Sequence, residues 1–147
     1  MATTDEAVFD AFPGIPIDRD NVEHYRGLLD RKLLINRCSQ CGYWVYPHRP
    51  LCPQCLSWDV VATEVSGQGR VFMFTLLHQE RDPHGHMDAP LPVAAIELAE
   101  QPGLRYLSTV VDCPPDQITP DMPVQLTWVD RDGLAWPAFT PAGPTGR

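Results

Sequence analysis

No apolar run in the 147-residue sequence is long enough to cross a bilayer as a helix. The first residues, MATTDEAVFDAF, also lack the basic and then apolar order of a signal peptide. We therefore expect a chain that stays in the reducing cytoplasm. Apolar residues make up 44% of the sequence and charged residues 20%, which predicts a folded, soluble protein of one modest domain plus a small module.

Cations are also scarce. Lys and Arg total 11 against 19 Asp and Glu, and the formal net charge is −8. An acidic surface repels phosphate backbones, so the composition argues against a nucleic-acid binder. Sixteen prolines interrupt the chain often enough to argue against an all-helical fold.

Four of the five cysteines lie in one stretch, CSQCGYWVYPHRPLCPQC. Cys38 and Cys41 form one C-x-x-C pair, and Cys52 and Cys55 form a second pair after ten intervening residues. Each pair fits a tight turn whose backbone N–H groups point at the sulfurs, and two such turns complete a tetrahedron of thiolates. This arrangement predicts one structural zinc ion per chain, because zinc accepts four thiolates in closed sites.

The alternatives for this cluster are iron in a rubredoxin-like site, two disulfides or four idle thiols. A reducing compartment disfavours disulfides, whereas iron accepts the same four ligands as zinc. Gly42 directly follows the first pair and permits a positive φ, while Leu56 occupies the matching position after the second. The second turn must therefore accommodate a bulky residue or adopt another geometry.

The remaining pattern predicts a mainly β protein. Residues 1–17 show no sustained period and are expected to be a flexible arm, whereas residues 18–32 follow helical spacing after Asp18, a candidate N-cap. We expect a zinc ribbon over residues 33–58 and a five- to six-stranded OB-like barrel over 59–140, with a tail at 141–147. The predicted strands cover 60–65, 70–78, 92–99, 104–111, 123–130 and 134–139.

The longest interruption between predicted strands runs from Gln79 to Leu91. A loop of this length in a small barrel is usually functional or disordered. It contains His84 and His86, and His78 precedes it. No cysteine or carboxylate stands at convincing spacing for a second metal site, so a mobile, solvated loop is the favoured interpretation.

The sequence offers no convincing pairing of a nucleophile with a base, so we expect no catalytic residues. Cys113 is followed by two prolines and has no histidine near it in sequence, so it is interpreted as a half-buried thiol at a strand end. A zinc ion held by four cysteines has no open position for water, which excludes hydrolytic zinc chemistry.

The order of these motifs resembles a known family. A helix, a CxxCG…CPxC ribbon, a VSGQGRVFMFTLLH strand, a PVAAIEL strand, a DMPVQLTW segment and a closing FTP are similar to the zinc-ribbon/OB-fold acyl-CoA-associated proteins, long known only as a domain of unknown function. The resemblance covers residues 22–141. Leu56 and Asp121 depart from it, since glycine often occupies both positions.

The resemblance implies an accessory subunit that is not itself catalytic. Members accompany thiolase-fold enzymes, namely thiolases, hydroxymethylglutaryl-CoA synthases, acyltransferases and steroid side-chain aldolases, and some accompany hot-dog-fold enoyl-CoA hydratases. Their barrel packs on the enzyme and helps to shape the acyl-CoA channel. The strand over 70–78 has consecutive apolar residues without clean alternation, which suggests an outward apolar patch. We therefore expect the partner or channel surface to include Arg70, Phe72, Phe74, His78, His84 and His86.

Two other functions remain open from the residues alone. A nucleic-acid-binding ribbon and barrel would show salt-sensitive gel shifts, although the strands lack basic–aromatic alternation. An iron electron carrier would be red, whereas a zinc protein is colourless.

Overall fold

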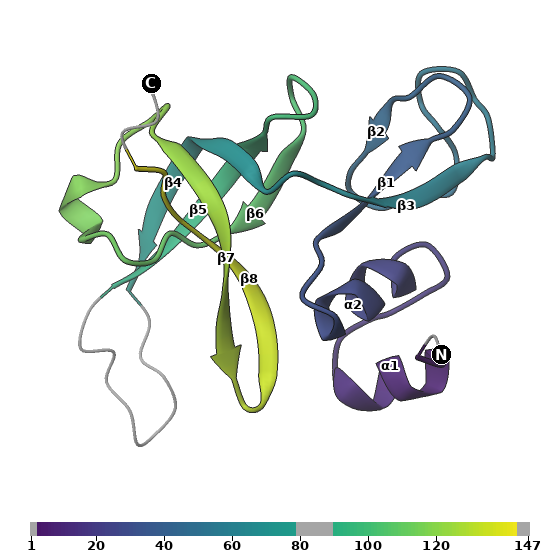
Figure 1. Ribbon diagram of the computed structural model, residues 1–147, viewed down its shortest axis with the longest axis horizontal. Helices are drawn as coiled ribbons and strands as arrows, with labels where there is room; N and C mark the ends of the chain where they lie inside the picture. Colours follow the sequence, from purple (N-terminus) through teal and green to yellow (C-terminus); the bar gives the residue numbers. More distant parts are fainter. Residues whose placement is uncertain (1–2, 79–89, 144–147) are drawn as a thin grey trace. The chain divides into compact units, whose positions relative to one another are not determined.

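The computed structural model describes residues 3–78 and 90–143. They form helices and strands in the order α1, α2, β1 to β6, the short 3-10 helix η1 (Pro115–Gln117), β7 and β8 (Figure 1). The chain divides into two compact units, residues 1–66 with 129–136 and residues 67–128 with 137–147. No helix within the described residues is long and apolar enough to span a membrane.

The expectation of a flexible arm over residues 1–17 was wrong, because this segment contains helix α1 (Asp5–Ala11). The Thr4 hydroxyl caps the helix by accepting a hydrogen bond from the amide of Ala7 at 3.2 Å. Val8 is fully buried. This capped helix of seven residues is too short to display a helical period in the sequence.

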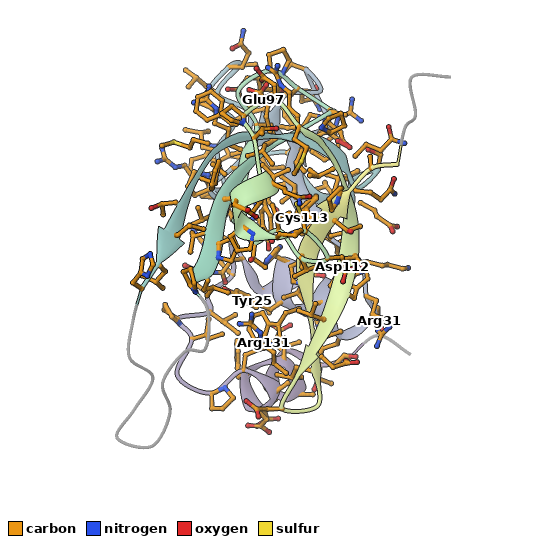
Figure 2. The ribbon with its side chains drawn as sticks, turned by 90° about the vertical axis from the view of Figure 1, so that its left-hand side faces the viewer. Tyr25, Arg31, Glu97, Asp112, Cys113 and Arg131 are labelled. Atoms are coloured by element: carbon orange, nitrogen blue, oxygen red, sulfur yellow. The ribbon has the colours of Figure 1, made fainter. Side chains whose placement is uncertain are left out.

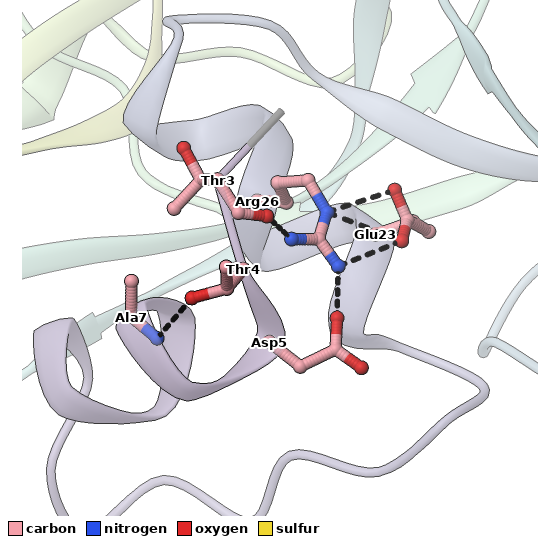
Figure 3. A network of polar contacts seen from close by, with 6 residues as sticks. All are labelled: Thr3, Thr4, Asp5, Ala7, Glu23 and Arg26. Carbon is pink, nitrogen blue, oxygen red and sulfur yellow. Dashed lines mark hydrogen bonds and ion pairs between the residues drawn. The ribbon is translucent and has the colours of Figure 1, made fainter. Parts of the chain in front are cut away.

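Helix α1 is also tied to helix α2 (Val22–Leu29) by one side chain. The guanidinium group of Arg26 donates to the carbonyl oxygen of Thr3 and to the carboxylate of Asp5 (Figure 3). It is held from its own helix by Glu23, with an ion-pair distance of 3.0 Å. These contacts join residues more than twenty positions apart, so no local sequence pattern could predict them.

The predicted helix over 18–32 is shorter in the structure. Asp18 and Asn21 exchange reciprocal hydrogen bonds, since each side-chain Oδ1 accepts from the other residue's amide, at 3.1 Å and 2.8 Å. This box closes a turn before α2 begins at Val22. The predicted N-cap role of Asp18 was therefore wrong, because the N-cap of α2 is Asn21 and Asp18 lies one turn ahead of the helix.

The apolar side chains on and just after α2 are buried within the first unit. Val22, Leu28 and Leu33 are buried. Tyr25 packs against Phe12, with ring centroids 5.2 Å apart. This apolar stripe therefore packs against the protein's own first unit.

The ribbon is a three-stranded antiparallel sheet in the order β2-β1-β3. Its strands are β1 (Leu34–Cys38), β2 (Trp44–Val45) and β3 (Val60–Glu64). The sequence placed β3 in the barrel, which was wrong, because β3 pairs with β1 along its whole length from Leu34↔Glu64 to Cys38↔Val60. The strand itself was predicted correctly. Its assignment to the ribbon depends on hydrogen bonds to a segment that is distant in the sequence.

The second sheet is a curled five-stranded OB-like structure in the order β6-β5-β4-β7-β8 (Figure 1). A parallel bridge between Val110 and Phe139 joins its two ends. Its interior is apolar and includes Val71, Ala94, Ile96 and Phe139, all fully buried. The predicted fold class is thus confirmed, with strands β4 (Gln68–Leu77), β5 (Leu91–Leu98), β6 (Arg105–Ser108), β7 (Pro123–Arg131) and β8 (Leu134–Pro141).

Candidate functional site

The first cysteine pair lies on a tight turn at the end of β1. The amide of Gly42 donates to the carbonyl of Cys38 at 2.9 Å, and the amide of Cys38 donates to the carbonyl of Tyr43 at 2.8 Å. Gly42 has a φ of 80°. A glycine adopts this conformation without strain, as the sequence predicted.

The second pair repeats this turn. The amide of Leu56 donates to the carbonyl of Cys52, and the amide of Cys52 donates to the carbonyl of Ser57, both at 2.9 Å. Leu56 therefore takes the glycine-like φ of 63°, and its side chain is 69% exposed. The geometry of the turn overrides the preference of the residue that occupies it.

The four sulfurs converge on one point. All ligand atoms of Cys38, Cys41, Cys52 and Cys55 lie within 4.8 Å of one another, and the Cys38–Cys55 and Cys41–Cys52 Sγ atoms are 3.6 Å apart. Zn–S bonds of about 2.3 Å imply an edge of roughly 3.8 Å in a tetrahedron. All four cysteines are unbridged, so the disulfide alternative does not apply to this geometry.

Local hydrogen bonds and mutual repulsion spread the acidities of these thiols. Backbone N–H groups, that of Cys41 foremost, lower the pKa of Cys38 to about 7. The pKa of Cys55 rises to about 12, because burial and the neighbouring cysteines outweigh the stabilising N–H of Ser57. Without a cation the four thiolates cannot coexist, so the donor set fits a divalent metal.

A second feature lies on β4, where the strand pairs with β5. The register shifts between Val71 and Met73, so Phe72 forms a β-bulge. Val71 points into the barrel, whereas Phe72 and Met73 are both exposed. Phe74 pairs with the buried Ala94 and is itself half-buried on the interior side. The bulge explains the missing alternation in the sequence.

The bulge residue contacts a cation from β6. The guanidinium carbon of Arg105 lies 3.5 Å from the centroid of the Phe72 ring. Arg105 is in turn 3.7 Å from the carboxylate of Glu97, which also accepts from Arg70 at 2.5 Å. The hydrogen bond from Arg70 is the main reason why the pKa of Glu97 is lowered.

Arg70, predicted at the partner or channel surface, lines a surface cleft of about 460 Å³ together with Gly69, Pro102 and Pro123. Its guanidinium group is already paired, since it binds Asp121 at 3.0 Å as well as Glu97. The observed role of Arg70 is therefore to join three segments of the second unit.

The structure separates the other predicted surface residues. Phe72 faces outward, Phe74 lies on the interior side, and His78 is exposed just after the end of β4. His84 and His86 lie outside the described residues. Sequence reasoning missed Arg105 and Leu107, because only the pairing of β6 with β5 brings these strands into one sheet with β4.

Cys113 is half-buried next to Asp112 on the loop between β6 and η1 (Figure 2). Its only described hydrogen bond runs from the thiol to the carbonyl of Pro114 at 3.5 Å. This environment offers no base in the described residues that would activate the thiol as a nucleophile.

Two family models together match most of the chain. Residues 26–61 match the rubredoxin-like zinc ribbon domain of ChsH2, and residues 62–129 match its C-terminal OB-fold domain. A DUF35 domain-containing scaffold protein of Methanocaldococcus jannaschii is 31% identical over 79% of this chain and 83% of its own length. The chain belongs to the ChsH2/DUF35 family. The matched ribbon is described as a zinc ribbon, and zinc is the metal that the cluster of Cys38, Cys41, Cys52 and Cys55 fits.

Solved structures of ChsH2/DUF35 proteins share this fold. A chain of the Ltp2-ChsH2(DUF35) aldolase superposes with a TM-score of 0.76 and 35% identity, covering 86% of this chain and 98% of that one. A DUF35 protein of unknown function from Sulfolobus solfataricus, at 16% identity and a TM-score of 0.58, shows the fold alone.

A longer relative is the probable enoyl-CoA hydratase alpha subunit of Thermomonospora curvata, which is 37% identical over 90% of this chain. The chain spans 40% of the length of that relative.

Proposed function

We propose that this chain is a non-catalytic accessory subunit of an acyl-CoA enzyme. The observation that carries the proposal is its 35% identity, over 98% of that chain, to a ChsH2(DUF35) chain that is named together with Ltp2 as an aldolase. The name of the Thermomonospora curvata relative adds an enoyl-CoA hydratase as a second associated activity. The relative from Methanocaldococcus jannaschii is named a scaffold protein, which is consistent with a subunit that organises other proteins.

The composition of the described residues supports a non-catalytic role. Four cysteines are committed to zinc, and a closed four-thiolate site has no position for a substrate or water. Cys113 has no activating base among the described residues. A subunit of this kind contributes binding surface, while its partner supplies the nucleophile and the base.

We further propose that the partner has the thiolase fold and that the barrel of this chain helps to shape its acyl-CoA channel. The resemblance of the motif order to acyl-CoA-associated ribbon–barrel proteins supports this finer assignment. Acyl-CoA would then bind at a site shared with the partner.

Co-expression with a thiolase-fold protein encoded by a neighbouring gene tests the proposal. We expect the two proteins to elute together in size-exclusion chromatography, and acyl-CoA turnover by the complex but not by this chain alone. A substantial thiolase, aldolase or hydratase rate from the purified chain free of any partner would contradict the non-catalytic assignment.

A further inference from the structure

Resting on the proposed function, we propose that one face of the second unit is the docking surface for the enzyme subunit. This docking face is the outer side of β4, β5 and β6 around the bulge. It consists of Phe72, Met73, Val93, Ala95 and Leu107.

Strand register places these side chains on one side of the sheet. Ala95 of β5 lies between Met73 of β4 and Leu107 of β6, and Val93 continues the row toward Thr75. The alternate residues of β5, such as Ile96 and Ala94, fill the interior instead and are fully buried. The docking face therefore extends across three strands that lie side by side in the sheet (Figure 1).

This face is apolar and open to solvent. Met73 is 59% exposed, Leu107 is 64% exposed and Phe72 is 38% exposed. A barrel of this size needs only one apolar side per strand for its core, so the outer set is not required for folding. Adjacent exposed apolar side chains on a soluble acidic protein are typical of a protein interface.

The bulge gives the face its central aromatic residue. In a regular strand Phe72 and Met73 would point to opposite sides, and one of them would enter the barrel. The extra residue turns both outward. Arg105 then stacks on the ring of Phe72 while Glu97 holds Arg105, so the aromatic side chain is already ordered in the free subunit. Arginine and large aromatic residues are enriched among the residues that dominate binding energy, and a side chain that is already ordered loses less entropy on binding.

The charges around the face indicate the chemistry of the occupant. Among the described residues of the second unit, Arg70 and Arg105 are the sole Lys or Arg side chains, and both lie in the row that borders the docking face. Arg70 is neutralised by Glu97 at 2.5 Å and by Asp121 at 3.0 Å. The half-exposed Arg105 lies 3.7 Å from Glu97, so Arg105 is the less tightly paired cation, and it lies beside Phe72. The complementary partner is a folded enzyme subunit with an apolar patch bordered by carboxylates, rather than a second copy of this chain, which would bring arginine to arginine.

Two substitutions test the docking face in the full chain. Phe72→Asp and Leu107→Asp each place a charge on this face without touching the interior. We expect each to raise the dissociation constant for the co-expressed thiolase-fold subunit by roughly tenfold or more. Phe72→Leu, which keeps an apolar group, should stay within about threefold of the wild type.

Val61→Asp is the matched control. Val61 is a strand residue of similar exposure, 56%, but it lies on β3 of the ribbon. It should leave the dissociation constant unchanged. Circular dichroism and zinc content are measured for every variant, so that only folded proteins are compared.

The outcomes separate this inference from the proposed function. If the wild type binds no thiolase-fold subunit, the proposed function fails. If the wild type binds and both aspartate variants bind equally well, the complex exists but the docking face lies elsewhere. A concentration-dependent dimer of the chain alone that Phe72→Asp abolishes would show that a second copy occupies the face, and would also overturn the inference.

Discussion

His48 follows β2, and within the described part of the chain neither of its buried ring nitrogens has a hydrogen-bond partner. Its ring lies 4.8 Å from that of His24 and 5.4 Å from that of Tyr46, centroid to centroid. Burial first, and then the neighbouring His24, lowers the pKa of His48 to about 4, while Asp18 opposes this shift. A neutral histidine is thus built into the first unit.

The lowered pKa of His48 predicts that the folded protein loses stability in acid. In the unfolded chain the imidazole of His48 is protonated below about pH 6.5, whereas in the folded protein it is protonated only below about pH 4. The free energy of unfolding therefore falls as pH drops through this window, by on the order of 2 kcal/mol for this residue. His48→Phe keeps the ring but removes the titration, so its loss of stability between pH 7 and 4 should be smaller.

The measurement is urea unfolding of both proteins across this range with zinc in excess. Protonation of the cysteine ligands destabilises the wild type and the variant alike, so the difference between the two curves reports His48. Identical pH dependence in the two proteins would show that the pKa of His48 is the same in the folded and unfolded states, as it is for a hydrated histidine.

Two residues with unfavourable backbone angles show how local preference yields to context. Leu56 and Asp121 have φ values of 63° and 64°, in the left-handed region that favours glycine. Asp121 tolerates this region and gains an ion pair with Arg70 at 3.0 Å. The exposed Leu56 gains no such contact among the interactions described, and its turn is maintained by the cysteine site.

At the scale of elements, the ribbon depends on its metal. Its strands are short, and β2 has only two residues. Zinc binding in comparable small sites contributes on the order of 10 kcal/mol to folding. We expect Cys52→Ser to lose stoichiometric zinc and to become protease-sensitive within the ribbon, as measured by elemental analysis and limited proteolysis.

Cys113→Ser is the matched control for that experiment, because Cys113 lies outside the cluster. It should keep one zinc ion per chain and a colourless solution. A Cys52→Ser protein with full zinc content and unchanged protease resistance would contradict a structural role for the four-cysteine site.

At the scale of the whole molecule, net charge limits the partners. The sequence carries a formal charge of −8; four thiolates subtract four and one Zn²⁺ adds two, which brings the chain to −10. Ribbons and OB barrels both bind nucleic acids in other proteins, but they do so with basic grooves and stacking aromatics.

We therefore predict no nucleic-acid binding by this protein. Gel shifts with single-stranded DNA and RNA should show no complex at micromolar protein in 0.15 M salt. An acidic protein of the same size serves as the negative control, and a single-stranded-DNA-binding OB protein as the positive one. A salt-sensitive shift would revive the alternative that the composition disfavours.

The sequence by itself determined the zinc site, because ligand type and C-x-x-C spacing are local chemistry that needs no knowledge of the fold. It also determined the existence of the barrel strands, since β-prone runs separated by turns are local patterns. It missed α1, which depends on a cap and on Arg26 from another helix. It misassigned β3, whose hydrogen-bond partners lie more than twenty residues away.

Only the tertiary structure decided the direction of the side chains on β4. The sequence of Val71, Phe72, Met73 and Phe74 does not determine which of these side chains point outward. That choice depends on a β-bulge that forms only where β4 pairs with β5. The pairing of β6 with β5 then brings Arg105 onto Phe72. A one-residue shift of register reverses every side chain of a strand, so the surface that we propose to bind a partner is a property of the sheet and not of any single strand.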